Sequence, residues 1–336
     1  MIHSRSRIAI LELLSLFMKD NSSATTIIRE VIPSRSITGL WWGLLGVAAF
    51  SFTVPFTRVA VGGLSPLFIG SGRAVVAAIL AASALVLTRQ RLPRGKQWAR
   101  LAVVAAGIVV GFPLLTSFAL TTAPASHGAV VIALLPAATA TAAVLRGREH
   151  PPAAFWLVTA VGAVAAIGFA LSQAGNPAQS GGFGQLNWAD VLLLGAVVSA
   201  AIGYAEGGLL ARELGAWQTV SWALVLALPL MAGLTALSVS QQPPSASPVQ
   251  WAAFAYLGVV SMFFGFVAWY RGLAVGPMAK VSQVQLIQPV LSICWAGLLL
   301  GESLGWTTIV GGLAVIACAG IAVRVRLNPQ PADQGR

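Results

Sequence analysis

Long apolar runs, broken by short polar segments, follow one another along most of the chain. A helix needs roughly 20 mostly apolar residues to cross the hydrocarbon core of a bilayer, so each run is long enough for one membrane-spanning helix. The ten runs cover residues 39–61, 66–87, 98–120, 124–145, 153–171, 189–210, 217–239, 249–269, 277–300 and 305–323. The pattern therefore predicts an all-α polytopic membrane protein with ten transmembrane helices.

The polar segments divide the runs into two sets of five. The longest break is the segment 172–188, which is rich in Gly, Ser and Asn, as a connection between helices should be. We therefore expect a first five-helix unit at 39–171 and a second at 189–325, joined by this linker. Residues 1–38 form an N-terminal segment and residues 326–336 a tail.

Basic residues support the same number of helices. Of the 20 Lys and Arg residues, all but Arg58 and Arg73 lie in the terminal segments or at alternate connections between runs. Cytoplasmic loops collect Lys and Arg, so we expect both termini in the cytoplasm and the linker outside.

Composition excludes a soluble domain. The chain is 57% hydrophobic and only 9% charged, whereas soluble domains are about 25% charged. Most of the surface is therefore expected to face the lipid bilayer. Topology explains the net charge of +11, so nucleic acid is not expected as a partner.

A short pattern occurs twice, about half the chain apart. Pro136 precedes Glu149 by 13 residues, and Pro289 precedes Glu302 by the same spacing. Because five helices are an odd number, the second unit would enter the membrane from the opposite side. The spacing thus predicts two inverted five-helix repeats, a plan found in many secondary transporters.

Each unit carries a proline inside a helix, and the second unit continues with the turn Leu299–Leu304 and the small-residue helix Thr308–Gly320. These residues resemble the EamA repeats of the drug/metabolite transporter (DMT) superfamily over about residues 40–325, although the turn at 146–152 departs from the pattern. The resemblance implies a ten-helix inner-membrane permease, often an exporter of amino acids or other small metabolites, with a cavity between its halves. It leaves the substrate open.

The ninth run holds the main candidates for a substrate site. A polar stripe at helical spacing is formed by Ser282, Gln285, Gln288 and Ser292. Glutamine amides donate and accept hydrogen bonds without charge, which suits a zwitterionic or polar neutral ligand. Pro289 lacks an N–H, so the helix can bend there and expose polar backbone to a cavity. Interhelical hydrogen bonding is the alternative explanation of the stripe.

Two further polar spots are candidates for contact with substrate. Glu206 lies among glycines in the sixth run and shares a helix face with Ser199. Its carboxylate either binds an amino group or a proton, or forms an ion pair with Arg212. Ser51 lies close to Pro55 in the first run, which makes a second kinked polar spot.

The charged residues Arg73, Arg58, Glu302 and Glu149 also lie in or beside the runs. Arg73 either attracts an anionic substrate group or holds neighbouring carbonyls as a structural residue. Arg58 and Glu302 both fall at external ends of runs, and we expect them to form an ion pair. Glu149 is the expected structural counterpart of Glu302 in the first unit.

Two features, in the fourth and the last run, have ordinary structural interpretations. His127, at the external start of the fourth run, is expected to be an ordinary exposed histidine rather than a titrating group. In the last run Ala314, Cys318 and Ala322 form a seam of small residues. Such a seam serves either helix packing or a homodimer contact.

Missing motifs narrow the function. The sequence has no phosphate-binding loop and no carboxylate, His or Cys spacing suited to a metal, so no cofactor and no metal are expected. We expect a transporter of small polar metabolites that works by alternating access, with hinges at Pro55, Pro136 and Pro289. Coupling to protons or another ion stays open. The alternatives are a membrane-embedded enzyme acting on lipid-linked substrates and a non-transporting sensor or scaffold.

Overall fold

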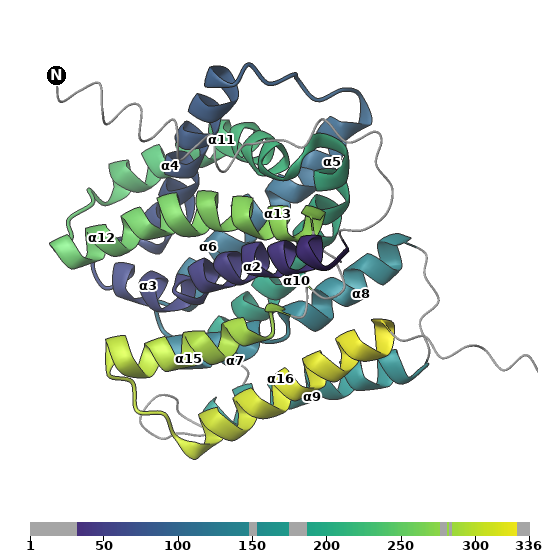
Figure 1. Ribbon diagram of the computed structural model, residues 1–336. Coiled ribbons are helices and arrows are strands. Elements are labelled where there is room, and N and C mark those ends of the chain that lie inside the picture. Colours follow the sequence, from purple (N-terminus) through teal and green to yellow (C-terminus); the bar gives the residue numbers. More distant parts are fainter. Residues whose placement is uncertain (1–31, 148–152, 175–186, 276–280, 282–283, 328–336) are drawn as a thin grey trace, which may run out of the picture.

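The computed structural model describes residues 32–147, 153–174, 187–275, 281 and 284–327, and this part of the chain is helical, with no β-strand (Figure 1). The helices before residue 175 are α2 (Ile32–Ser51), α3 (Thr53–Ala60), α4 (Pro66–Leu87), α5 (Lys96–Val104), η1 (Ala105–Gly111), α6 (Phe112–Ala119), α7 (Ala125–Ile132), α8 (Leu135–Gly147) and α9 (Ala153–Ala174). Those after residue 187 are α10 (Trp188–Leu214), α11 (Ala216–Gln241), α12 (Pro248–Tyr256), η2 (Leu257–Gly265), α13 (Phe266–Val275), α15 (Ile287–Leu300) and α16 (Trp306–Leu327).

Seven stretches of the described residues are long and apolar enough to cross a membrane. They are Ile37–Ala60, Pro66–Leu87, Lys96–Ala119, Ala125–Arg146, Trp188–Leu214, Ala216–Gln241 and Pro248–Val275. Three shorter apolar helices are Trp156–Ala165, Ile287–Leu300 and Trp306–Cys318. The prediction of an all-helical protein with several membrane spans is thus confirmed for the described residues.

Parts of several predictions lie outside the described residues. They concern residues 1–31 of the N-terminal segment, residues 175–186 of the linker, the tail from residue 328, and the candidates Glu149 and Ser282.

Prolines account for two of the breaks within spans. The α2 helix ends at Ser51, whose carbonyl would need an N–H from Pro55 to continue the helical hydrogen bonds. In the same way α7 ends at Ile132, four residues before Pro136. Each half also contains one π-helix, η1 and η2, whose first residues lie 152 positions apart. Such interruptions are often found at functional sites.

Helices of the first half pack mainly on helices of the second half. The most extensive contacts join α4 to α11, α9 to α16, and α2 to α13, and α10 packs against α8 and α6. Figure 1 shows α9 and α16 side by side at one edge of the bundle, and α2 beside α13. The two sequence halves therefore form one interleaved bundle.

Glycine and other small residues allow the closest of these approaches. A Cβ atom added to Gly272 in α13 would lie 2.7 Å from the backbone nitrogen of Gly43 in α2. A Cβ atom on Gly162 in α9 would lie 3.0 Å from the Cβ of Cys318 in α16. Cys318, in the predicted seam of small residues, thus packs within the chain, and the homodimer alternative stays a prediction.

Candidate functional site

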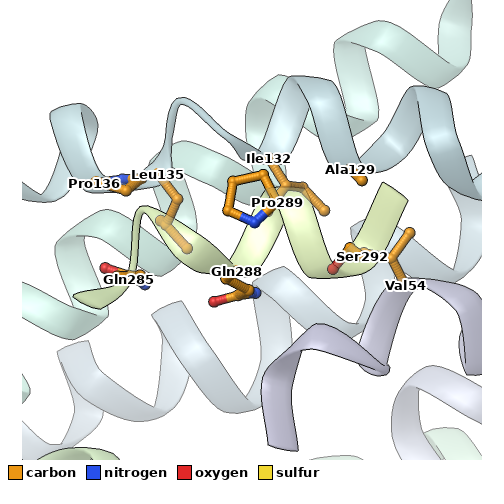
Figure 2. A pocket seen from close by; sticks show the side chains of 9 residues that line it. All are labelled: Val54, Ala129, Ile132, Leu135, Pro136, Gln285, Gln288, Pro289 and Ser292. Atoms are coloured by element: carbon orange, nitrogen blue, oxygen red, sulfur yellow. The ribbon is translucent and has the colours of Figure 1, made fainter. Parts of the chain in front are cut away.

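A small pocket lies where α3, α7, α8 and α15 meet (Figure 2). Its lining residues are Val54, Ala129, Ile132, Leu135, Pro136, Gln285, Gln288, Pro289 and Ser292. The pocket has a volume of about 10 Å³, which is room for about one water molecule. The structure therefore brings two of the predicted hinge prolines and three residues of the predicted polar stripe to one closed site.

The two glutamines of this pocket have unpartnered polar atoms. Gln285 and Gln288 are 3% and 7% exposed. Among the described residues, the Nε2 atom of Gln285 and the Oε1 atom of Gln288 have no hydrogen-bond partner. Leaving a buried donor or acceptor unpaired costs about 1–3 kcal/mol each. The pocket thus presents one free donor and one free acceptor, which a polar ligand would satisfy.

The backbone around Pro289 is irregular, as the missing N–H requires. The carbonyl of Gln285, four residues before Pro289, accepts instead from the Gln288 N–H at 3.1 Å. Gln285 lies in the turn before α15 and Gln288 in its first turn. Figure 2 shows both side chains on this segment, with Leu135 and Pro136 approaching from α8.

Ser292 and Ser51 have hydrogen bonds to each other's helices. The Ser292 hydroxyl donates to the Ser51 carbonyl at 2.7 Å, taking the place of the N–H that Pro55 lacks. The Trp295 Nε1–H donates to the Ser51 Oγ at 3.0 Å. These bonds hold α15 against the break between α2 and α3. The Ser292 hydroxyl thus has a hydrogen-bond partner, whereas Gln285 Nε2 and Gln288 Oε1 have none among the described residues.

Glu206 lies elsewhere, at the end of the bundle predicted to be cytoplasmic. Its two carboxylate oxygens accept from the Nε atoms of Arg100 and Arg146, and the Arg146 bond is 2.7 Å long. Arg100 also donates through Nη1 to Glu213. The carboxylate thus joins α10 to α5 and α8. The sequence offered Arg212 as the ion-pair partner of Glu206, but in the structure Glu206 pairs with Arg100 and Arg146.

Ser199 shares the helix of Glu206 but not its cluster. Its hydroxyl donates to the Gly107 carbonyl of η1 at 3.1 Å, which ties α10 to the π-helix. The predicted face of Ser199 and Glu206 therefore points at neighbouring helices and does not reach the glutamine pocket.

A second cavity, of about 540 Å³, opens between α5, α8 and α10 beside this charged cluster. It is lined by Ala99, Arg100, Val103, Ala142, Leu145, Arg146, Ile202, Ala205 and Glu206. We refer to it as the α5/α8 cavity. Its volume falls within the range of about 300–1,000 Å³ that is usual for ligand sites.

The predicted ion pair between Arg58 and Glu302 is wrong. Arg58 Nη1 donates to the carbonyls of Leu120 and Thr121 at 2.7 and 2.8 Å. Glu302 accepts from two backbone N–H groups at the start of α7, at 2.8 and 2.9 Å. A cation at a helix C-terminus and an anion at a helix N-terminus both complement the helix dipole. Each residue therefore stabilises a helix end at the α6–α7 connection.

Arg73 is buried in α4 and is 1% exposed. Its Nε atom has no hydrogen-bond partner among the described residues, and Arg73 does not line the glutamine pocket. Its part in substrate binding stays a prediction.

His127 and Asp190 form a buried pair that sequence reasoning missed. The Nε2 atom of His127 in α7 lies 2.6 Å from Oδ1 of Asp190 in α10. The expectation of an exposed histidine is wrong, since both side chains are buried. Asp190 follows Asn187 by three residues in a capping box, and this spacing is the sequence signal that could have located a helix start here.

The long apolar helices of the described residues define a multi-pass membrane protein. The sequence profile of the EamA-like transporter family matches twice, over residues 37–171 and 187–324. The chain belongs to this family. It is accordingly a transporter and not an enzyme, as the resemblance implied.

Two relatives and one solved structure extend the comparison. The "Uncharacterized transporter YdeK" of Bacillus subtilis (strain 168) is 42% identical over 291 residues, covering 87% of this chain and 99% of the relative. A "Probable terminal-alkyne amino-acid exporter" of Streptantibioticus cattleyicolor is 27% identical over 283 residues, covering 83% of this chain and 91% of the relative. A crystal structure with 20% identity has a TM-score of 0.57, covering 87% of this chain and 99% of the other, and shows a shared fold.

Proposed function

We propose that the protein is a secondary transporter that exports amino acids or related small polar metabolites. The observation that carries the proposal is the pair of buried, unpartnered amides of Gln285 and Gln288 in a proline-flanked pocket. Amides can bind the ammonium and the carboxylate of a zwitterion without a fixed charge of their own. The name of the Streptantibioticus cattleyicolor relative, an amino-acid exporter, agrees with this substrate class.

The transport mechanism we propose is alternating access between two inverted five-helix repeats. The family profile matches the two halves separately. The helices α9 and α16 each have 22 residues and begin 153 positions apart. Helices that would be equivalent also meet in pairs, α4 with α11 and α9 with α16. These correspondences support ten spans, with α9, α15 and α16 joining the seven long apolar stretches.

The closed pocket fits one state of such a cycle. With room for about one water molecule, it admits no amino acid until α15 moves away from α7 and α8. Pro136 and Pro289 both line the pocket, and the helices are already interrupted next to them. We therefore place the moving segments at these two prolines, with Pro55 at the break between α2 and α3 as the third hinge.

The test is amino-acid efflux from loaded proteoliposomes with the double variant Gln285→Ala and Gln288→Ala. We expect efflux to fall about 10-fold or more, because each lost amide hydrogen bond is worth about 0.5–1.5 kcal/mol. Gln242→Ala is the matched control, since Gln242 is exposed in the loop after α11. Unchanged efflux of every amino acid tested in the double variant would remove the glutamine pocket as the binding site.

A further inference from the structure

Two equivalent positions in the halves carry very different side chains. Trp295 follows Pro289 by six residues, and Ala142 follows Pro136 by the same spacing. The Trp295 ring stacks on Phe52, with centroids 4.6 Å apart and an interplanar angle of 16°. Ala142, in contrast, lines the open α5/α8 cavity.

Aromatic rings fill the region around Trp295. Phe56 and Tyr256 meet edge to face with centroids 4.8 Å apart, and Phe52 lies 5.8 Å from Tyr256. The Tyr256 hydroxyl also donates to the Ala49 carbonyl at 3.1 Å. Partly buried rings from α3, α12 and α15 are therefore packed against one another at this end of the bundle. At the opposite end the corresponding space, between α10, α5 and α8, is a cavity of about 540 Å³.

The α5/α8 cavity has a charged end and an apolar wall. The apolar wall is formed by Val103, Leu145 and Ile202, all of which are exposed on the molecular surface. The charged end is the cluster of Arg100, Arg146 and Glu206. A ligand that fits this shape has a small charged head and an apolar body.

The charged end offers guanidinium donors together with the remaining acceptor capacity of Glu206. Each oxygen of Glu206 accepts one hydrogen bond, one from Arg100 and the other from Arg146, and keeps a second lone pair for another donor. Arg146 uses only its Nε for this contact, and its side chain is 54% exposed. The Nη1 and Nη2 atoms of Arg146 thus point to no acceptor in the part of the chain that the structure describes. Two parallel guanidinium donors match the geometry of a carboxylate.

We propose that the α5/α8 cavity is a loading site that binds an amino acid with an apolar side chain before it reaches the glutamine pocket. The carboxylate of the ligand binds the Nη atoms of Arg146, its ammonium group lies beside the Glu206 carboxylate, and its side chain packs on Val103, Leu145 and Ile202. The inference rests on the proposed export function and narrows its substrate class to apolar amino acids.

The loading site is tested by protection of an introduced cysteine, with L-leucine as the probe. Leu145→Cys is placed in a chain that carries Cys294→Ala and Cys318→Ala, and its reaction with a maleimide is timed in purified protein. We expect saturating leucine to slow the reaction about 10-fold. The methyl ester of leucine, which lacks the carboxylate, should give no protection. Equal protection by leucine and its ester would overturn the role of Arg146.

Two variants address the site directly, and one serves as the control. Arg146→Gln removes the guanidinium, and Ala142→Trp fills the cavity as Trp295 fills the opposite end, with every charge retained. Both should abolish protection in protein that still elutes as a single folded species. Arg91→Gln changes an exposed arginine outside the cavity and should leave protection intact. Protection that survives both cavity variants would contradict the proposal.

The ammonium group and the export function are tested separately. The acid 4-methylpentanoate has the carboxylate and the apolar body of leucine but no ammonium, and protection as strong as that by leucine would overturn the choice of an amino acid. In the Gln285→Ala and Gln288→Ala background, protection should persist although efflux is lost. If leucine gives no protection but efflux still depends on the two glutamines, the loading site alone is overturned. If leucine protects but efflux is unchanged in the glutamine double variant, the proposed export site alone is overturned.

Discussion

At the scale of single residues, the polar residues of the predicted stripe have two different roles: one holds helices together, and two have atoms available to a ligand. Pro55 leaves the Ser51 carbonyl without a helical donor, and Ser292 donates to it. Gln285 and Gln288 belong to the same predicted stripe but keep unpartnered amide atoms. The residues of this stripe share one helical spacing but differ in role. Ser292 holds two helices together, and Gln285 and Gln288 offer unpartnered atoms to the pocket.

The hydrogen bond from Ser292 predicts a loss of stability in Ser292→Ala. The buried Ser51 carbonyl would lose its partner, at a cost of about 1–3 kcal/mol. We expect a lower thermal unfolding temperature in detergent. Ser240→Ala is the matched control, because Ser240 is exposed and bonds only within its own helix. Equal unfolding temperatures for the two variants would argue against this bond.

Residue partners at helix ends are the least predictable feature. The sequence favours a pair between Arg58 and Glu302 because both lie at the same end of the bundle and carry opposite charge. The structure gives each of them backbone groups at the α6–α7 connection instead. Spacing along the chain indicates the depth of a charge in the membrane, but it does not show which helix terminus lies beside it.

At the scale of the elements, close packing between the halves depends on residues without a side chain. The α2 and α13 helices approach each other at Gly43 and Gly272, where a Cβ atom would be 2.7 Å from backbone. Such contacts allow van der Waals packing between helices where lipid supplies no hydrophobic driving force.

We therefore expect Gly272→Ala to destabilise the protein. The added methyl group would force α13 away from α2, and overpacking of this kind costs about 1–3 kcal/mol. Gly233→Ala in α11 is the matched control, because a Cβ atom there meets nothing within 4 Å. Thermal unfolding of both variants measures the difference. A Gly272→Ala protein as stable as Gly233→Ala would contradict the close approach of these helices.

At the scale of the whole molecule, the two ends of the bundle differ. Aromatic rings around Trp295 fill one end, while an ion cluster around Glu206 borders a cavity at the other. The His127–Asp190 pair and the Glu206 cluster both tie α10 to helices of the first half. The unit that moves with α7 and α8 is thus expected to include α10 from the second half.

The orientation of the bundle can be measured by cysteine labelling from either side. In a chain with Cys294→Ala and Cys318→Ala, Ser245→Cys should react with an impermeant maleimide in intact cells. Arg91→Cys should react only after the membrane is opened, since basic loops are retained in the cytoplasm. Both positions are exposed in loops at opposite ends of the bundle. The reverse pattern would invert the topology.

The sequence by itself determined the class of protein, the approximate bounds of its helices, and the residues of the polar stripe. Hydropathy determines these features locally, because each helix satisfies its own backbone hydrogen bonds in lipid. The stripe of Gln285 and Gln288 followed from helical spacing, and the structure places both residues in one pocket with Pro136.

Only the tertiary structure decided which polar residues meet. It joined Glu206 to Arg100 and Arg146 and paired His127 with Asp190, although these residues lie about 60 or more positions from their partners. It also left Arg73 away from the glutamine pocket. Such partners depend on how separate helices are rotated and stacked against each other, and helix rotation is set by the sum of many interhelical contacts that no local pattern in the chain records.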